Sequence, residues 1–92
     1  MPALSSAQIA EGLSDIPEWR LENGALTRSF SFPDFREAMS FVNSVAAVAE
    51  RAGHHPDIDI RYNKVNLALS SHDAGGITER DFGLAAEIGA IL

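Results

Sequence analysis

The fold is decided by residues 35–53, FREAMSFVNSVAAVAERAG. Apolar side chains recur here at intervals of three and four residues, a spacing that places them on one face of an α-helix. This face consists of Phe35, Ala38, Met39, Val42, Val45, Ala46 and Ala49. Asp34 is the expected N-cap and Gly53 the expected end of the helix. The stretch therefore predicts one long amphipathic helix that packs on a second layer.

A second apolar stripe on this helix widens the face beyond what one side of a sheet requires. Its members are Phe41, Val45, Val48 and Ala52. A chain of 92 residues also buries a limited share of its surface and gains from association. We therefore expect a homodimer or homotetramer, with a helix-mediated contact between subunits.

Strand patterns flank this helix on both sides. Residues 19–22 and 25–32 surround Asn23-Gly24, a strong hairpin signal because both residues tolerate positive φ. Residues 57–62 and 65–70 alternate between apolar and polar side chains, with Asn63-Lys64 between them. Capping patterns predict helices after Ser5 and after Thr78. We predict a single α+β domain over residues 1–92, with three helices on one face of a four-stranded antiparallel sheet in the order α-β-β-α-β-β-α.

The composition limits the classes of partner. Apolar residues make up 46% and charged residues 22% of the chain, which is typical of a folded globular domain. A net charge of −6 argues against direct nucleic-acid binding, which depends on clustered lysine and arginine. There is no cysteine, so a disulfide framework and a thiol mechanism are excluded. With no apolar run long enough to span a membrane and no secretory signal pattern, we expect a cytoplasmic protein.

The three histidines lie at the ends of predicted elements. His54 and His55 follow the long helix, and His72 follows the last predicted strand. Histidine titrates near neutrality, so two converging segments would form a proton-transfer site. Glu50, one helical turn before His54, is the expected orienter of its ring. Structural alternatives remain open: helix-capping histidines, a solvated loop histidine, and Asp81 as a capping-box carboxylate.

Metal and cofactor binding are not expected. His54 and His55 are adjacent and precede Pro56, so their rings should point in different directions rather than towards one ion. Phosphate-loop and dinucleotide fingerprints are absent from the sequence.

Three motifs resemble those of the pterin-4a-carbinolamine dehydratases (4a-hydroxytetrahydrobiopterin dehydratases). They are ERAGHHPD at 50–57, YNKV at 62–65 and SHDAGGITERD at 71–81. The resemblance covers most of the chain and implies a hydro-lyase that converts 4a-hydroxytetrahydropterin to quinonoid dihydropterin. It also implies metal-free acid–base catalysis without a cofactor, homo-oligomers, and a link to aromatic amino acid hydroxylases through tetrahydrobiopterin recycling.

The resemblance also implies a set of site residues. The catalytic residues would be His54, His55 and His72, of which we expect His54 and His72 to move the two protons while His55 orients the ring. These histidines would bind the pterin together with Pro56, Ser71, Asp73 and Ala74, and the supporting residues would be Glu50, Trp19 and Asp81. The alternative function is a protein-interaction module with little or no catalysis, such as a dimerisation cofactor of a transcription factor.

Overall fold

The computed structural model describes residues 2–92 and confirms the predicted order of elements. The helices and strands are α1 (Ser6–Leu13), β1 (Arg20–Glu22), β2 (Ala25–Ser31), α2 (Phe35–Ala52), β3 (Asp57–Arg61), β4 (Lys64–Leu69) and α3 (Glu79–Ala90). A short 3-10 turn, η1 (His72–Ala74), separates β4 from α3. No helix within residues 2–92 is long and apolar enough to cross a membrane.

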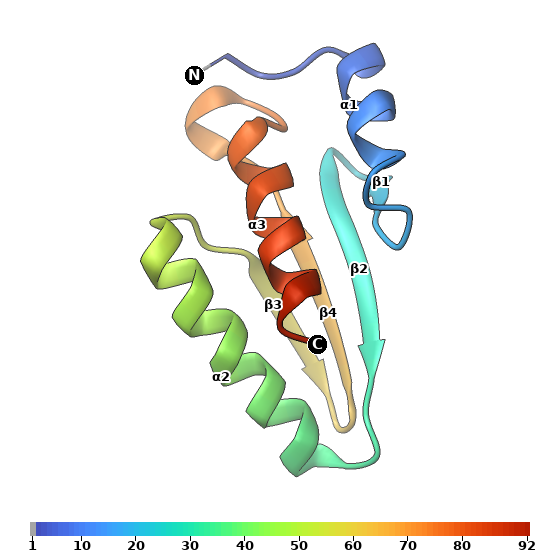
Figure 1. Cartoon of the computed structure of the whole chain (residues 1–92), viewed down its shortest axis with the longest axis vertical. Coiled ribbons are helices and arrows are strands. Elements are labelled where there is room, and N and C mark those ends of the chain that lie inside the picture. The colour runs from blue at the N-terminus through green and yellow to red at the C-terminus, as the bar shows by residue number, and fades with distance from the viewer. Residues whose placement is uncertain (1) are drawn as a thin grey trace.

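The four strands form one antiparallel sheet in the spatial order β1-β2-β4-β3. The two central strands pair over six positions, from Leu26 opposite Leu69 to Ser31 opposite Lys64. The helices α2 and α3 lie side by side on one face of this sheet, as Figure 1 shows, and α1 lies near β1. The open face and the edge strand β3 stay outside this helical layer.

The core forms where α2 and α3 cover the central strands. Leu26, Leu67 and Leu69 are almost completely buried. Phe41 of α2 packs against Phe30 of the sheet, with 4.6 Å between ring centroids. Alternation along the strands thus places their apolar side chains under the helices, as the sequence predicts.

The expected subunit contact through Phe41 and Val48 is wrong. Both side chains are buried inside the chain, at 6% and 4% exposure. Phe41 also packs against Phe32 at a centroid distance of 5.1 Å, so this stripe faces the sheet. Ala46 and Phe35, from the other stripe, are exposed instead. Helical periodicity predicts the width of the apolar face of a helix. Contacts with the sheet determine how the helix is rotated about its own axis.

The helix ends match the sequence pattern. The Asp34 carboxylate accepts a hydrogen bond from the Glu37 N–H at 2.8 Å, and Gly53 adopts the left-handed conformation at φ 66°. Glycine enters this region without the steric cost that a Cβ imposes. Gly53 therefore ends α2 at the point where the chain turns into the histidine segment.

The N-terminal segment is tied to the chain just before α3. The Leu4 N–H donates to the Ile77 carbonyl at 2.7 Å. Gly76 lies so close to this segment that an added Cβ would be 3.2 Å from the Ala3 Cβ. Gly12 of α1 is likewise in close contact with the Phe82 ring of α3. Residues from the two ends of the sequence therefore pack together here.

The hairpin between β3 and β4 turns one residue earlier than the sequence predicts. Tyr62 and Asn63 form the turn, and Lys64 already belongs to β4. Tyr62 adopts φ 54°, and the Asn63 side-chain amide donates to the Phe32 carbonyl at 2.8 Å. This long-range hydrogen bond holds Asn63 in the turn and is not visible in a local pattern.

Candidate active site

A buried histidine–carboxylate pair lies where α2 ends and α3 begins. His54 follows the glycine cap of α2 and is 9% exposed, while Asp81 in the first turn of α3 is fully buried. The His54 Nε2 lies 2.5 Å from the Asp81 Oδ1. The pair joins two segments that are 27 residues apart in the sequence.

The contacts of Asp81 show which ring nitrogen of His54 is hydrogen-bonded. The Asp81 Oδ2 accepts from the Thr78 N–H and from the Ser71 hydroxyl, both at 2.9 Å. An ionised carboxylate can only accept hydrogen bonds, so beside ionised Asp81 the His54 Nε2 is the donor. The contact with Asp81 uses the His54 Nε2, and the Nδ1 lies outside this pair.

Ser71 connects this pair to the loop that carries His72. The Ser71 hydroxyl also contacts the Thr78 hydroxyl at 2.8 Å. The Ser71 N–H donates to the Gly76 carbonyl at 2.8 Å, which closes the loop around η1. Asp81 is therefore hydrogen-bonded to both predicted site segments.

The hollow beside His72 does not include the other two imidazole rings. His72 is exposed and lines a hollow of about 310 Å³ between its own loop and the β1–β2 turn. The hollow is lined by Asn23, Gly24, Ser70, Ser71, His72, Gly75 and Gly76. His54, His55 and Pro56 are not among these residues. The structure brings the backbone segments that carry these histidines together, but His72 faces the β1–β2 turn.

Glu50 does not orient His54, which corrects the expectation from the sequence. Its Oε1 lies 2.6 Å from the His55 Nε2, and both side chains are largely exposed, at 77% and 62%. The left-handed Gly53 reverses the chain, so His54 points inward to α3 while His55 turns back to the last turn of α2. Helical spacing predicted the wrong partner because the chain leaves the helix at this glycine.

Two other predicted residues have different surroundings. Trp19 is 3% exposed and packs edge-on against Phe30, with 6.4 Å between ring centroids, so it is a core side chain. Asp73 is exposed and accepts a hydrogen bond at 2.6 Å from the Arg80 guanidinium. This bond holds the pKa of the Asp73 carboxyl below its usual range.

The sequence predicted Thr78 as the cap of the last helix and Ser71 as a pterin-binding residue, but it missed three side-chain contacts of this arrangement. Thr78 contacts Ser71 and caps α3, Ser71 contacts Asp81, and Arg80 contacts Asp73. Their signal lay inside the motif at residues 71–81, which contains two hydroxyls, one arginine and three carboxylates. Which of them meet depends on how the loop closes.

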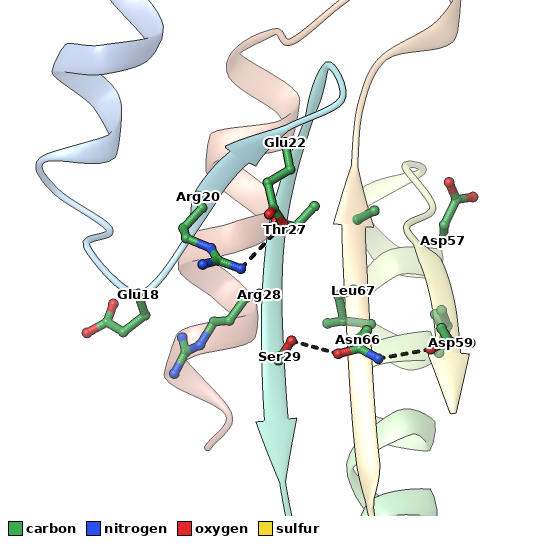
Figure 2. Close-up of a pocket in the computed structure, with 12 residues that line it drawn as sticks. Glu18, Arg20, Glu22, Thr27, Arg28, Ser29, Asp57, Asp59, Asn66 and Leu67 are labelled. Carbon is green, nitrogen blue, oxygen red and sulfur yellow. Dashed lines mark hydrogen bonds and ion pairs between the residues drawn. The ribbon is translucent and has the colours of Figure 1, made fainter. Parts of the chain in front are cut away.

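A separate hollow of about 580 Å³ lies on the open face of the sheet (Figure 2). The Ser29 hydroxyl donates to the Asn66 side chain at 2.6 Å, and Asn66 donates to Asp59 at 2.9 Å. No histidine lines this hollow. Its hydrogen-bonded side chains come from β2, β4 and β3, and it lies away from the candidate active site.

A histidine whose Nε2 is held by a carboxylate suits general acid–base chemistry, because its second ring nitrogen can give or take a proton. Within the part of the chain that the structure describes, no group of three or more histidine, aspartate or glutamate side chains is arranged to hold a metal ion.

Solved structures share this architecture. A transcriptional coactivator/pterin dehydratase from Brucella melitensis is 35% identical, covers 97% of each chain and superposes with a TM-score of 0.91. A pterin dehydratase-like protein, identified as a RuBisCO assembly factor in the α-carboxysome, is 27% identical with a TM-score of 0.68. It covers 80% of this chain and 88% of its own. The fold is therefore that of the pterin dehydratase class.

Sequence comparison identifies the family. The model for pterin 4 alpha carbinolamine dehydratase matches residues 2–91, and the chain belongs to this family. A protein from Chloroflexus aurantiacus is 59% identical over 92 residues, which is all of this chain and 99% of its own. A protein from Acidobacterium capsulatum is also 59% identical and is covered completely. Both relatives are provisionally named pterin-4-alpha-carbinolamine dehydratase, a hydro-lyase.

Proposed function

We propose that the protein dehydrates 4a-hydroxytetrahydropterin to quinonoid dihydropterin by metal-free histidine acid–base catalysis. The observation that carries the proposal is the buried His54–Asp81 pair, which Ser71 connects to the His72 loop. Family membership supports the substrate class.

The reaction needs two proton transfers and no covalent intermediate. An acid protonates the 4a-hydroxyl, the C4a–O bond breaks and water leaves. A base removes the proton from the adjacent ring nitrogen, and a carbon–nitrogen double bond forms. Positioned acid–base groups contribute about 10²- to 10⁴-fold, which is sufficient for a labile hydroxyl.

In this proposal the three histidines have different roles. His54 uses Nδ1 to exchange a proton while Asp81 stabilises the ring from the other side, and His72 exchanges the second proton. His55, held by Glu50, orients the pterin ring. Pro56, Asp73 and Ala74 shape the rest of the site in this proposal, and neither a metal nor a cofactor takes part.

A stopped-flow assay with 4a-hydroxytetrahydropterin tests the proposal. We expect His54→Ala and His72→Ala to lower kcat by about 10²-fold or more, in line with the loss of one acid–base group. We expect His55→Ala chiefly to raise KM. Circular dichroism checks that each variant is folded. Full activity in all three variants would reject the assignment.

The proposal extends to the assembly and its cellular role. We propose a cytoplasmic homodimer or homotetramer that serves tetrahydrobiopterin recycling for an aromatic amino acid hydroxylase. Support for assembly comes from β3, an edge strand whose five residues are all exposed. Its two aspartates precede Arg61, so antiparallel pairing with a second copy would bring Arg61 near the aspartates of the other strand.

A second candidate function is partner binding without catalysis. It is favoured by the two solved neighbours, which are described as a coactivator and an assembly factor. Substrate turnover by the purified protein would decide against it. An inactive protein that forms a stable hetero-oligomer would support it.

A further inference from the structure

Two consecutive residues in the first turn of α3 contact the two histidine segments. Asp81 holds His54 at 2.5 Å, and Arg80 holds Asp73, the neighbour of His72, at 2.6 Å. Both contacts come from side chains whose backbone positions are fixed by the Thr78 capping box. The first turn of α3 therefore sets the distance between the two segments.

The contact of Arg80 with Asp73 is shorter than that of an ordinary surface ion pair. The Arg80 Nη2 to Asp73 Oδ1 distance of 2.6 Å is that of a charge-assisted hydrogen bond. By comparison, Arg51 and Glu87 are 3.8 Å apart on the helical surface. The Arg80 side chain is 36% exposed and reaches Asp73 from a partly covered position.

The Arg80 Nε is buried and has no hydrogen-bond partner within residues 2–92. A buried donor without a partner is unfavourable. The hydrogen bond from the Arg80 Nη2 to Asp73 therefore stabilises this placement of the side chain. Nearby backbone bonds, from Ala74 to the Ser71 carbonyl and from Gly75 to the His72 carbonyl, keep the turn compact around Asp73.

We propose that Arg80 is a positioning residue that fixes His72 by holding Asp73, while Asp81 fixes His54. The inference rests on the proposed function for its catalytic consequence. Asp73 then contributes to catalysis by binding Arg80 and not by contact with the pterin.

A double-mutant cycle of Asp73→Asn and Arg80→Gln tests the inference in the full-length protein. We expect each single variant to lower kcat by about tenfold with little change in KM. This is less than the roughly 100-fold loss of rate that a catalytic group misplaced by about 1 Å can cause. The double variant should be no slower than the slower single variant, because both remove the same contact. Arg80→Lys, which keeps the charge, should recover part of the rate.

The imidazole NMR signals give a readout that does not depend on turnover. We expect the His72 signals to shift in both single variants while the His54 signals stay in place. Arg51→Gln, which removes the longer ion pair to Glu87, is the matched control and should change neither the rate nor the signals.

Three outcomes separate this inference from the proposed function. Unchanged His72 signals in both variants would overturn the positioning role, whatever the activity. Additive losses with a raised KM only in Arg80→Gln would also overturn it, because Arg80 would then contact the substrate directly. Shifted His72 signals in a protein that does not dehydrate the pterin would support positioning and reject the enzymatic proposal.

Discussion

At the scale of single residues, Asp81 combines two roles that usually belong to different side chains. Its Oδ2 accepts the Thr78 N–H in the capping box of α3, and its Oδ1 contacts His54. A fully buried carboxylate is tolerated because each oxygen is hydrogen-bonded. The helix cap that the sequence left open for Asp81 is therefore confirmed, and the same carboxylate also contacts His54.

Replacing Asp81 should cost both stability and activity. We expect Asp81→Asn to lower the free energy of unfolding by about 2–4 kcal/mol, because an amide nitrogen cannot accept from the buried donors. Urea denaturation gives this value. Asp59→Asn, which alters a half-exposed carboxylate that also accepts two hydrogen bonds, should cost much less, because solvent screens an exposed group. Equal losses in the two variants would contradict the importance of the buried network.

The Asp73 carboxyl should titrate below the usual aspartate range. The hydrogen bond from Arg80 lowers its pKa in the folded protein. The contact is therefore intact at neutral pH and is lost as the pH falls through this lowered pKa, below the unfolded value of about 3.9. An NMR titration of the side-chain carboxyl should show a midpoint that rises towards the ordinary value in Arg80→Gln. A midpoint unaffected by this substitution would disprove the coupling.

At the scale of helices and strands, local signals predicted most of the fold. Asp34, Gly53 and Thr78 mark helix ends as expected, because a cap depends on neighbouring backbone groups. The rotation of α2 was predicted less well, since Phe41 faces the sheet through contacts with Phe30 and Phe32. Periodicity alone does not contain this information.

The candidate site was less predictable than the fold. The sequence singled out His54 and Asp81 but did not pair them, because 27 residues separate them. It paired Glu50 with His54 from helical spacing, whereas Glu50 contacts His55. Partners of side chains near an element end depend on how the chain leaves that element.

The packing of α1 on α3 can be tested with two glycines. A Cβ at Gly12 would lie 2.7 Å from the Phe82 ring, so Gly12→Ala must displace the ring and should lower stability by about 1 kcal/mol. Gly83→Ala in α3 meets nothing within 4 Å and should raise stability by about 0.5–1 kcal/mol through helix propensity. Thermal unfolding of both variants is the measurement. A stabilising Gly12→Ala would show that the ring moves without cost.

At the scale of the whole molecule, the exposed edge of the sheet is the main unsatisfied surface. Ile58 and Ile60 of β3 remain 38% and 37% exposed, although their partners on β4, Leu67 and Val65, are buried. Unpaired strand edges favour association with another strand. We therefore regard β3 as the surface that would be buried in a homo-oligomer.

A charge in the middle of β3 should disrupt the assembly. We expect the unmodified protein to be a dimer or tetramer in light scattering at micromolar concentration and Ile60→Lys to shift it towards the monomer. Leu21→Lys, on the opposite edge strand β1, is the matched control because Leu21 is similarly exposed, at 45%. A monomeric unmodified protein, or dissociation only in Leu21→Lys, would contradict assembly through β3.

The contact of the N-terminal segment with the loop before α3 has a consequence for the dynamics of the molecule. Leu4 donates to Ile77, and Ala3 lies against Gly76, next to the residue that caps α3. Segments outside the sheet detach more readily than strands inside it. Each detachment of this segment would expose the start of α3 to water, so the lifetime of the arrangement around His54 depends in part on residues fifty positions away.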